Sequence, residues 1–68
     1  MDISWEDNFF IRVGIQDGAT VISANKAGLQ SLIKHLHTLA EEPPGSHIHL
    51  DEHNALEDGS TELIIERS

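Results

Sequence analysis

Polar and apolar residues alternate strictly in one short run of the chain, Ser-His-Ile-His-Leu-Asp at 46–51. Alternation with a period of two is typical of a β-strand that is buried on one face only. The polar face would carry three side chains: His47, His49 and Asp51. Ile48 and Leu50 would point to the opposite, buried face. The pattern predicts a strand at 46–51.

Two runs rich in β-forming residues lie nearer the start, at 9–15 and 19–24. Asp17-Gly18 separates them, and Asp-Gly between two such runs is a strong signal for a tight turn, since glycine adopts positive φ without strain. We therefore expect an antiparallel hairpin over residues 9–24. Phe9, Ile11, Val13 and Ile15 would share one face of the first strand, and Ile11, Val13 and their neighbours would turn that face toward the helix.

A helix is expected to begin after Asn25, whose side chain can accept hydrogen bonds from the first free amides, and to run to about Glu41. Apolar residues recur there at the spacing of a single buried stripe: Leu29, Leu32, Ile33, Leu36, Leu39 and Ala40. Gly28 is unfavourable inside a helix. Close packing against the sheet would be a reason for a glycine there, but the sequence alone does not show such packing. Pro43-Pro44 should end the helix.

The rest of the chain predicts a polar connection at 52–60 and a last strand at 61–67. Leu56 is the one large apolar residue of the connection, so we expect it to attach this loop to the core. Asp58-Gly59 supplies a second turn signal.

Together these elements predict a β-β-α-β-β chain of the α+β class, with one amphipathic helix packed on one face of a mostly antiparallel four-stranded sheet. Residues 1–68 would form a single small domain. Residues 1–8 are expected to be loosely held, although a further strand could begin around Ile3–Glu6. The helix cannot cover both faces of the sheet, so the polar face of strand 46–51 should point outward.

Charge narrows the class of partner. Twelve acidic and four basic residues give a formal net charge of −8 at pH 7. Such a chain repels nucleic acids and anionic membranes, and it attracts basic proteins. There is no cysteine, no apolar run long enough to span a bilayer, and the first residues are acidic where a signal peptide would be basic. We expect a soluble cytoplasmic protein.

Two kinds of chemistry could use the histidines. His47, His49 and Asp51, with His53 two residues later, have a local spacing that could hold a metal ion. The alternative is a polar strand face whose imidazoles bind neighbours or water. A serine next to a histidine could in principle act as a nucleophile, but the chain has no nucleophile elbow and little room for a pocket that excludes water. The sequence therefore does not favour an enzyme.

Acidic residues concentrate in the last third of the chain: Asp51, Glu52, Glu57, Asp58, Glu62 and Glu66. Glu62 and Glu66 alternate on the last predicted strand. They could form a solvated face, or they could join the histidines in a surface that is complementary to a basic protein.

Four segments resemble the immunity protein 32 family of bacterial polymorphic toxin systems, and the likeness extends over residues 9–67. They are the helix start at 23–29, the helix end at 36–40, the strand Gly-Ser-His-Ile-His-Leu-Asp at 45–51, and the ending at 56–65. The resemblance implies a small α+β protein that is encoded beside a toxin, binds that toxin and neutralises it in the producing cell, with no catalytic activity. We expect no cofactor.

We therefore expect a partner-binding surface made of His47, His49, Asp51, Glu62 and Glu66, which faces a toxin that is itself basic. Two other hypotheses stay open. One is a small metal-binding domain that uses His47, His49 and Asp51. The other is a structural domain that forms a homodimer through an exposed sheet face or edge.

Overall fold

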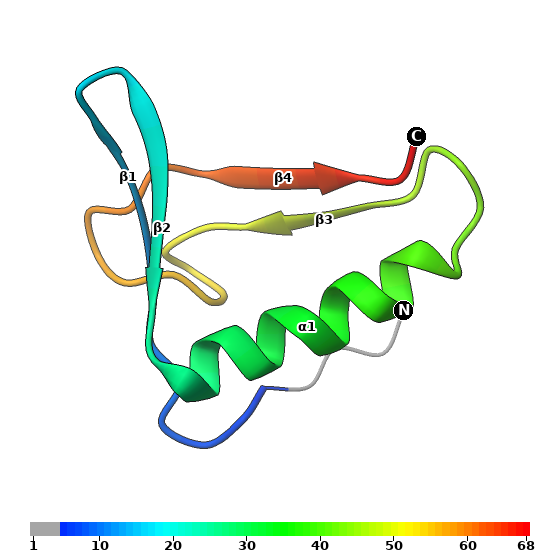
Figure 1. Ribbon diagram of the computed structural model, residues 1–68, viewed down its shortest axis with the longest axis horizontal. Helices are drawn as coiled ribbons and strands as arrows, with labels where there is room; N and C mark the ends of the chain where they lie inside the picture. The colour runs from blue at the N-terminus through cyan, green and yellow to red at the C-terminus, as the bar shows by residue number, and fades with distance from the viewer. Residues whose placement is uncertain (1–4) are drawn as a thin grey trace.

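The computed structural model describes residues 5–68, which fold into four strands and one helix (Figure 1). In chain order these are β1 (Ile11–Gln16), β2 (Ala19–Ala24), α1 (Lys26–Ala40), β3 (His47–Leu50) and β4 (Leu63–Glu66). The order confirms the predicted β-β-α-β-β chain and the α+β class. The expected strand around Ile3–Glu6 lies partly outside the described residues, and Trp5 and Glu6 are not in a strand.

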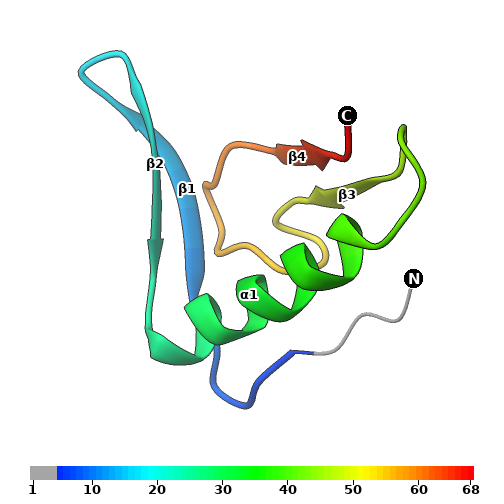
Figure 2. The same ribbon diagram turned by 45° about the vertical axis from the view of Figure 1, so that its right-hand side comes forward.

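The strands form two antiparallel pairs, so the prediction of one continuous four-stranded sheet is wrong. β1 pairs with β2, and β3 pairs with β4, each in a two-stranded sheet. Figures 1 and 2 show that β3 and β4 run across the direction of β1 and β2, with α1 beneath both hairpins. The first, third and last strands are also shorter or shifted relative to the predicted ranges.

The connection between β3 and β4 explains the break in the sheet. The amides of Glu57 and Thr61 donate to the carbonyls of Ile11 and Val13, at 2.9 and 2.8 Å, and the amide of Val13 donates to Ser60 Oγ at 3.2 Å. An irregular segment thus occupies the edge of β1 that does not pair with β2. The outward backbone groups of Ile11 and Val13 therefore have hydrogen-bond partners although no further strand pairs with β1.

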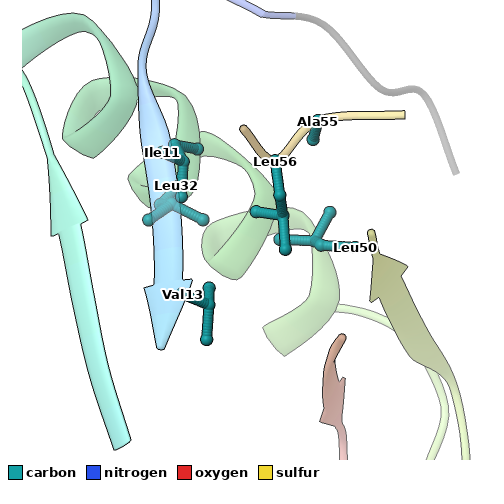
Figure 3. Packing of buried hydrophobic residues seen from close by; sticks show 6 residues of the cluster. All are labelled: Ile11, Val13, Leu32, Leu50, Ala55 and Leu56. Atoms are coloured by element: carbon teal, nitrogen blue, oxygen red, sulfur yellow. The ribbon is translucent and has the colours of Figure 1, made fainter. Parts of the chain in front are cut away.

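The hydrophobic core lies between the hairpins and α1 (Figure 3). It draws side chains from both hairpins, the helix and the connection: Ile11, Val13, Leu32, Leu50, Ala55 and Leu56. All six are at most 8 % exposed. The prediction that Leu56 attaches the loop to the core is confirmed, as is the inward direction of Ile48 and Leu50.

The buried face of α1 differs from the predicted stripe. Its buried residues are Gly28, Ser31, Leu32, His35 and Leu39. Four members of the predicted stripe are instead exposed: Leu29, Ile33, Leu36 and Ala40. The pattern of apolar residues was correct for a helix, but the helix is rotated so that small and polar residues meet the core.

Contacts with the N-terminal segment explain this rotation. The Trp5 ring lies edge-on to His35, with ring centroids 4.2 Å apart, and stacks on Phe9. The amide of Glu6 donates to Ser31 Oγ at 2.8 Å. These partners let α1 bury a histidine and a serine, which a hydrophobicity pattern assigns to solvent.

Asn25 caps the start of α1, as the sequence predicts, and it also fixes the helix to the first hairpin, which the sequence did not predict. Asn25 Oδ1 accepts from the amide of Gly28 at 2.8 Å and from the amide of Phe10 at 3.0 Å. A Cβ atom added to Gly28 would lie 2.3 Å from the carbonyl oxygen of Phe10 and 3.0 Å from the side chain of Ile11. The helix therefore approaches β1 at a distance that only glycine allows.

We expect Gly28→Ala to lower the free energy of unfolding, although alanine is the better helix former by about 1 kcal/mol. The clash is with backbone, which cannot move as a side-chain tip can, and overpacking of this kind costs about 1–3 kcal/mol. Urea denaturation followed by circular dichroism measures the change.

Gly14→Ala is the matched control, because a Cβ at Gly14 meets no atom within 4 Å. It should leave stability unchanged or raise it slightly. A Gly28→Ala variant as stable as the Gly14→Ala variant would contradict the close approach of α1 to β1.

Candidate partner-binding face

The outer face of the second hairpin brings together the residues that the sequence selected. In the register of β3 and β4, His47 lies opposite Glu66 and His49 opposite Ile64. Cross-strand partners point to the same side of a sheet. His47 and His49 are exposed, whereas Ile48 and Leu50 between them are buried in the core. We call this surface the outer face: His47, His49, Asp51, Glu62, Ile64 and Glu66.

His49 is the centre of a small polar cluster. Its Nε2 lies 3.0 Å from Glu62 Oε2 and 3.8 Å from Asp51 Oδ2. All three side chains keep contact with solvent, so the pairs are screened and contribute little to stability. The closer contact orients the His49 imidazole toward the Glu62 carboxylate.

Asp51 has a structural role that sequence reasoning missed. Its Oδ1 accepts from the amide of His53 at 2.9 Å, and its carbonyl accepts from the amides of three following residues, Asn54, Ala55 and Leu56. Asp51 thus closes the turn that delivers Leu56 to the core.

Asn54 was also missed, and it completes this turn. Its Oδ1 accepts from the amide of Asp51 at 2.9 Å, and its Nδ2 donates to the carbonyl of His49 at 2.8 Å. The side chain thereby fixes the end of β3, next to the cluster around His49. The signal in the sequence was an Asp-x-x-Asn turn, in which both side chains can bind nearby backbone.

Ile64 is the second residue that the site prediction omitted. Its side chain is 60 % exposed, although it sits in the middle of a strand. His49 lies across from it, Glu66 follows it on the same face of β4, and Glu62, just before β4, contacts His49. A large apolar side chain surrounded by imidazoles and carboxylates is the arrangement of an interface centre with a polar rim.

A hollow of about 200 Å³ opens beside the outer face. It is lined by Asp51, Glu52, His53, Ser60 and Glu62. Three of these five residues are acidic, so the hollow would accept a cationic side chain more readily than an anionic one.

The remaining histidines lie elsewhere. His53 is exposed in the turn, His37 is exposed on α1, and His35 is buried against Trp5. Among residues 5–68, no three histidines and carboxylates are grouped so that they could hold a metal ion. No helix in the same part of the chain has the length and apolar character needed to cross a membrane.

Comparison with known families decides the class of protein. The model of the immunity protein 32 family matches residues 19–68, which include the whole outer face and well over half of the chain. The chain belongs to the immunity protein 32 family. No curated protein and no solved structure matches it. Members of immunity protein families typically have no enzymatic activity, and their general partner is a toxin.

In this immunity protein, Asn54→Ala should lower the free energy of unfolding by about 1 kcal/mol, because two hydrogen bonds to backbone are lost at the surface. Thermal denaturation measures the effect. His53→Ala is the control, since it alters an exposed side chain in the same turn and keeps both contacts of Asn54. Equal melting temperatures for the two variants would show that Asn54 does not fix the turn.

Proposed function

We propose that this protein neutralises a cognate bacterial toxin by binding it directly, in the cytoplasm of the cell that makes the toxin. Membership of the immunity protein 32 family supports the role. The outer face supplies the surface, and His47, His49, Asp51, Glu62 and Glu66 make its polar part. Binding alone blocks the toxin, so this chain performs no reaction and needs no cofactor.

The position of Ile64 among the histidines and carboxylates of the outer face, rather than its exposure alone, supports this assignment. Ile64 faces solvent on the side of the second hairpin that α1 does not cover, while its neighbour Ile65 is partly buried. Burying an exposed isoleucine in a partner would contribute about 1.5–3 kcal/mol. The histidines and carboxylates around it would exclude water and set the orientation of the partner.

Charge indicates that the toxin surface is basic. Six carboxylates lie at 51–66, and the same range contains no lysine or arginine. A field of one sign speeds the encounter with a partner of the opposite sign, and the gain falls as salt rises. The acidic hollow next to His49 offers a place for one lysine or arginine of the toxin.

We expect co-expression with the toxin encoded by the adjacent gene to restore growth of cells that the toxin otherwise kills. The two proteins should then co-purify as a complex. A chain that neither protects cells nor co-purifies with the toxin would exclude the proposed function.

Ile64→Arg should weaken toxin binding by at least about tenfold, which corresponds to 1.4 kcal/mol. It removes the apolar centre and adds a cation that repels a basic partner. The double variant His47→Ala and His49→Ala should weaken binding in the same direction. Isothermal titration calorimetry measures both.

Ile15→Arg is the matched control, because Ile15 is 66 % exposed on β1, close to the 60 % of Ile64. It should bind the toxin with unchanged affinity. If complexes of Ile64→Arg and Ile15→Arg are equally tight while both proteins remain folded, the toxin binds elsewhere.

A further inference from the structure

Helix α1 carries two parallel rows of residues with the same spacing of 4, 3 and 4 positions. The first row is buried against the core: Gly28, Leu32, His35 and Leu39. The second row begins one residue later and is exposed: Leu29, Ile33, Leu36 and Ala40. This spacing is that of an apolar seam between two packed helices. The helix therefore packs one row of residues against the core of its own chain. The other row is exposed in the described part of the chain.

The second row, which we call the α1 stripe, exposes large apolar side chains. Leu29 is 51 % exposed, Ile33 65 % and Leu36 43 %. Single exposed apolar residues are ordinary, but a contiguous row of them on one helix marks an interaction site. The side chains of His47 and His49 point away from α1, because Ile48 and Leu50 between them face the core. The α1 stripe is thus separate from the outer face.

The charges at the ends of α1 are unfavourable for the helix itself. Its first residue is Lys26, and there is no acidic residue in its first turn. Glu41 and Glu42 follow its last residue. The dipole of a helix favours anions at the N-terminus and cations at the C-terminus, so Lys26 and the two glutamates have the unfavourable sign, and His37 is the one basic residue of the last turn. Among the ion pairs of residues 5–68, none involves Lys26 or either glutamate.

A second copy of α1 in antiparallel orientation would correct both ends. Ile33 is the midpoint of the helix, since 33 − 26 and 40 − 33 are both 7. A two-fold axis at Ile33 places Lys26 of each copy opposite Ala40 of the other, next to Glu41. Each cation then meets a carboxylate and the negative end of a helix dipole, and this happens twice.

The same charges argue against a basic partner on this stripe. Residues 26–40 contain two lysines and no aspartate or glutamate, although the whole chain carries twelve acidic residues. The acidic field that would attract a basic toxin is therefore weakest along α1.

We infer that the α1 stripe is the contact of a homodimer, in which two copies of α1 pack antiparallel about Ile33 with Lys26 of one copy beside Glu41 of the other. This interface goes beyond the proposed toxin binding and leaves the outer face of both copies open. Three partly exposed side chains per copy are few compared with the roughly 800 Å² per partner of a standard interface, so the dimer is weak.

Sedimentation equilibrium of the protein without toxin, from roughly 10 µM to 1 mM, tests the dimer. The native chain should shift from monomer to dimer across this range. Ile33→Glu should remain monomeric throughout, because it would place two carboxylates on the two-fold axis. Ile15→Glu should dimerise like the native chain, since Ile15 is 66 % exposed but lies on β1.

A charge exchange tests the orientation. Lys26→Glu alone and Glu41→Lys alone should each weaken the dimer, and the double variant should restore it. Lys26→Glu should at the same time raise the melting temperature of the monomer at low concentration, because it improves the helix dipole of a single copy. A Lys26→Glu variant with a weaker dimer but a higher monomer melting temperature has lost a dimer contact, whereas a damaged fold would lower both.

Three results would overturn the proposal. The first is a native chain that stays monomeric at every concentration. The second is a dimer that survives Ile33→Glu, which would assign the contact to another surface such as the edge of β2. The third is a native monomer whose Ile33→Glu variant loses toxin binding, which would make the α1 stripe a toxin surface. Ile64→Arg should leave the dimer intact, so failure of the toxin assignment and failure of the dimer are distinguishable.

Discussion

The hydrogen bonds between residues 57–61 and β1 hold the two halves of this fold together. A two-stranded hairpin is marginally stable in water, and here there are two of them with no ladder between them. The amides of Glu57 and Thr61 bind β1 from one side, while Leu56 from the same segment fills the core. One irregular connection therefore provides both the polar and the apolar link between the hairpins, and the position of the outer face depends on it.

Local patterns in the sequence predicted most of the elements, because strand alternation, the Asp-Gly turn, the Asn25 cap and the proline pair each act within a few residues. The rotation of α1 was predicted wrongly. It is decided by Trp5 and Ser31, whose contacts join residues far apart in the chain. The single sheet failed for a similar reason, since a periodicity cannot show that a polar loop will occupy the edge of β1.

The outer face was predicted in direction but not in full composition. The period of a strand is enough to place His47 and His49 on one side, and the register of β3 with β4 adds Glu66 opposite. Alternation with Glu62 and Glu66 also places Ile64 on this side, but the predicted surface named only its polar residues. Asn54 was missed because its role consists of two contacts to backbone, which depend on the shape of the turn.

The tip of the first hairpin lies apart from the core, the outer face and the α1 stripe. Asp17 and Gly18 adopt φ values of 51° and 82°, which suit a tight two-residue turn, and the tip extends beyond the rest of the molecule (Figure 1). No core side chain comes from these two residues. This turn is consequently a suitable place to attach a fluorophore or to insert a short epitope, with which the proposed toxin binding and the proposed dimer could be followed in living cells.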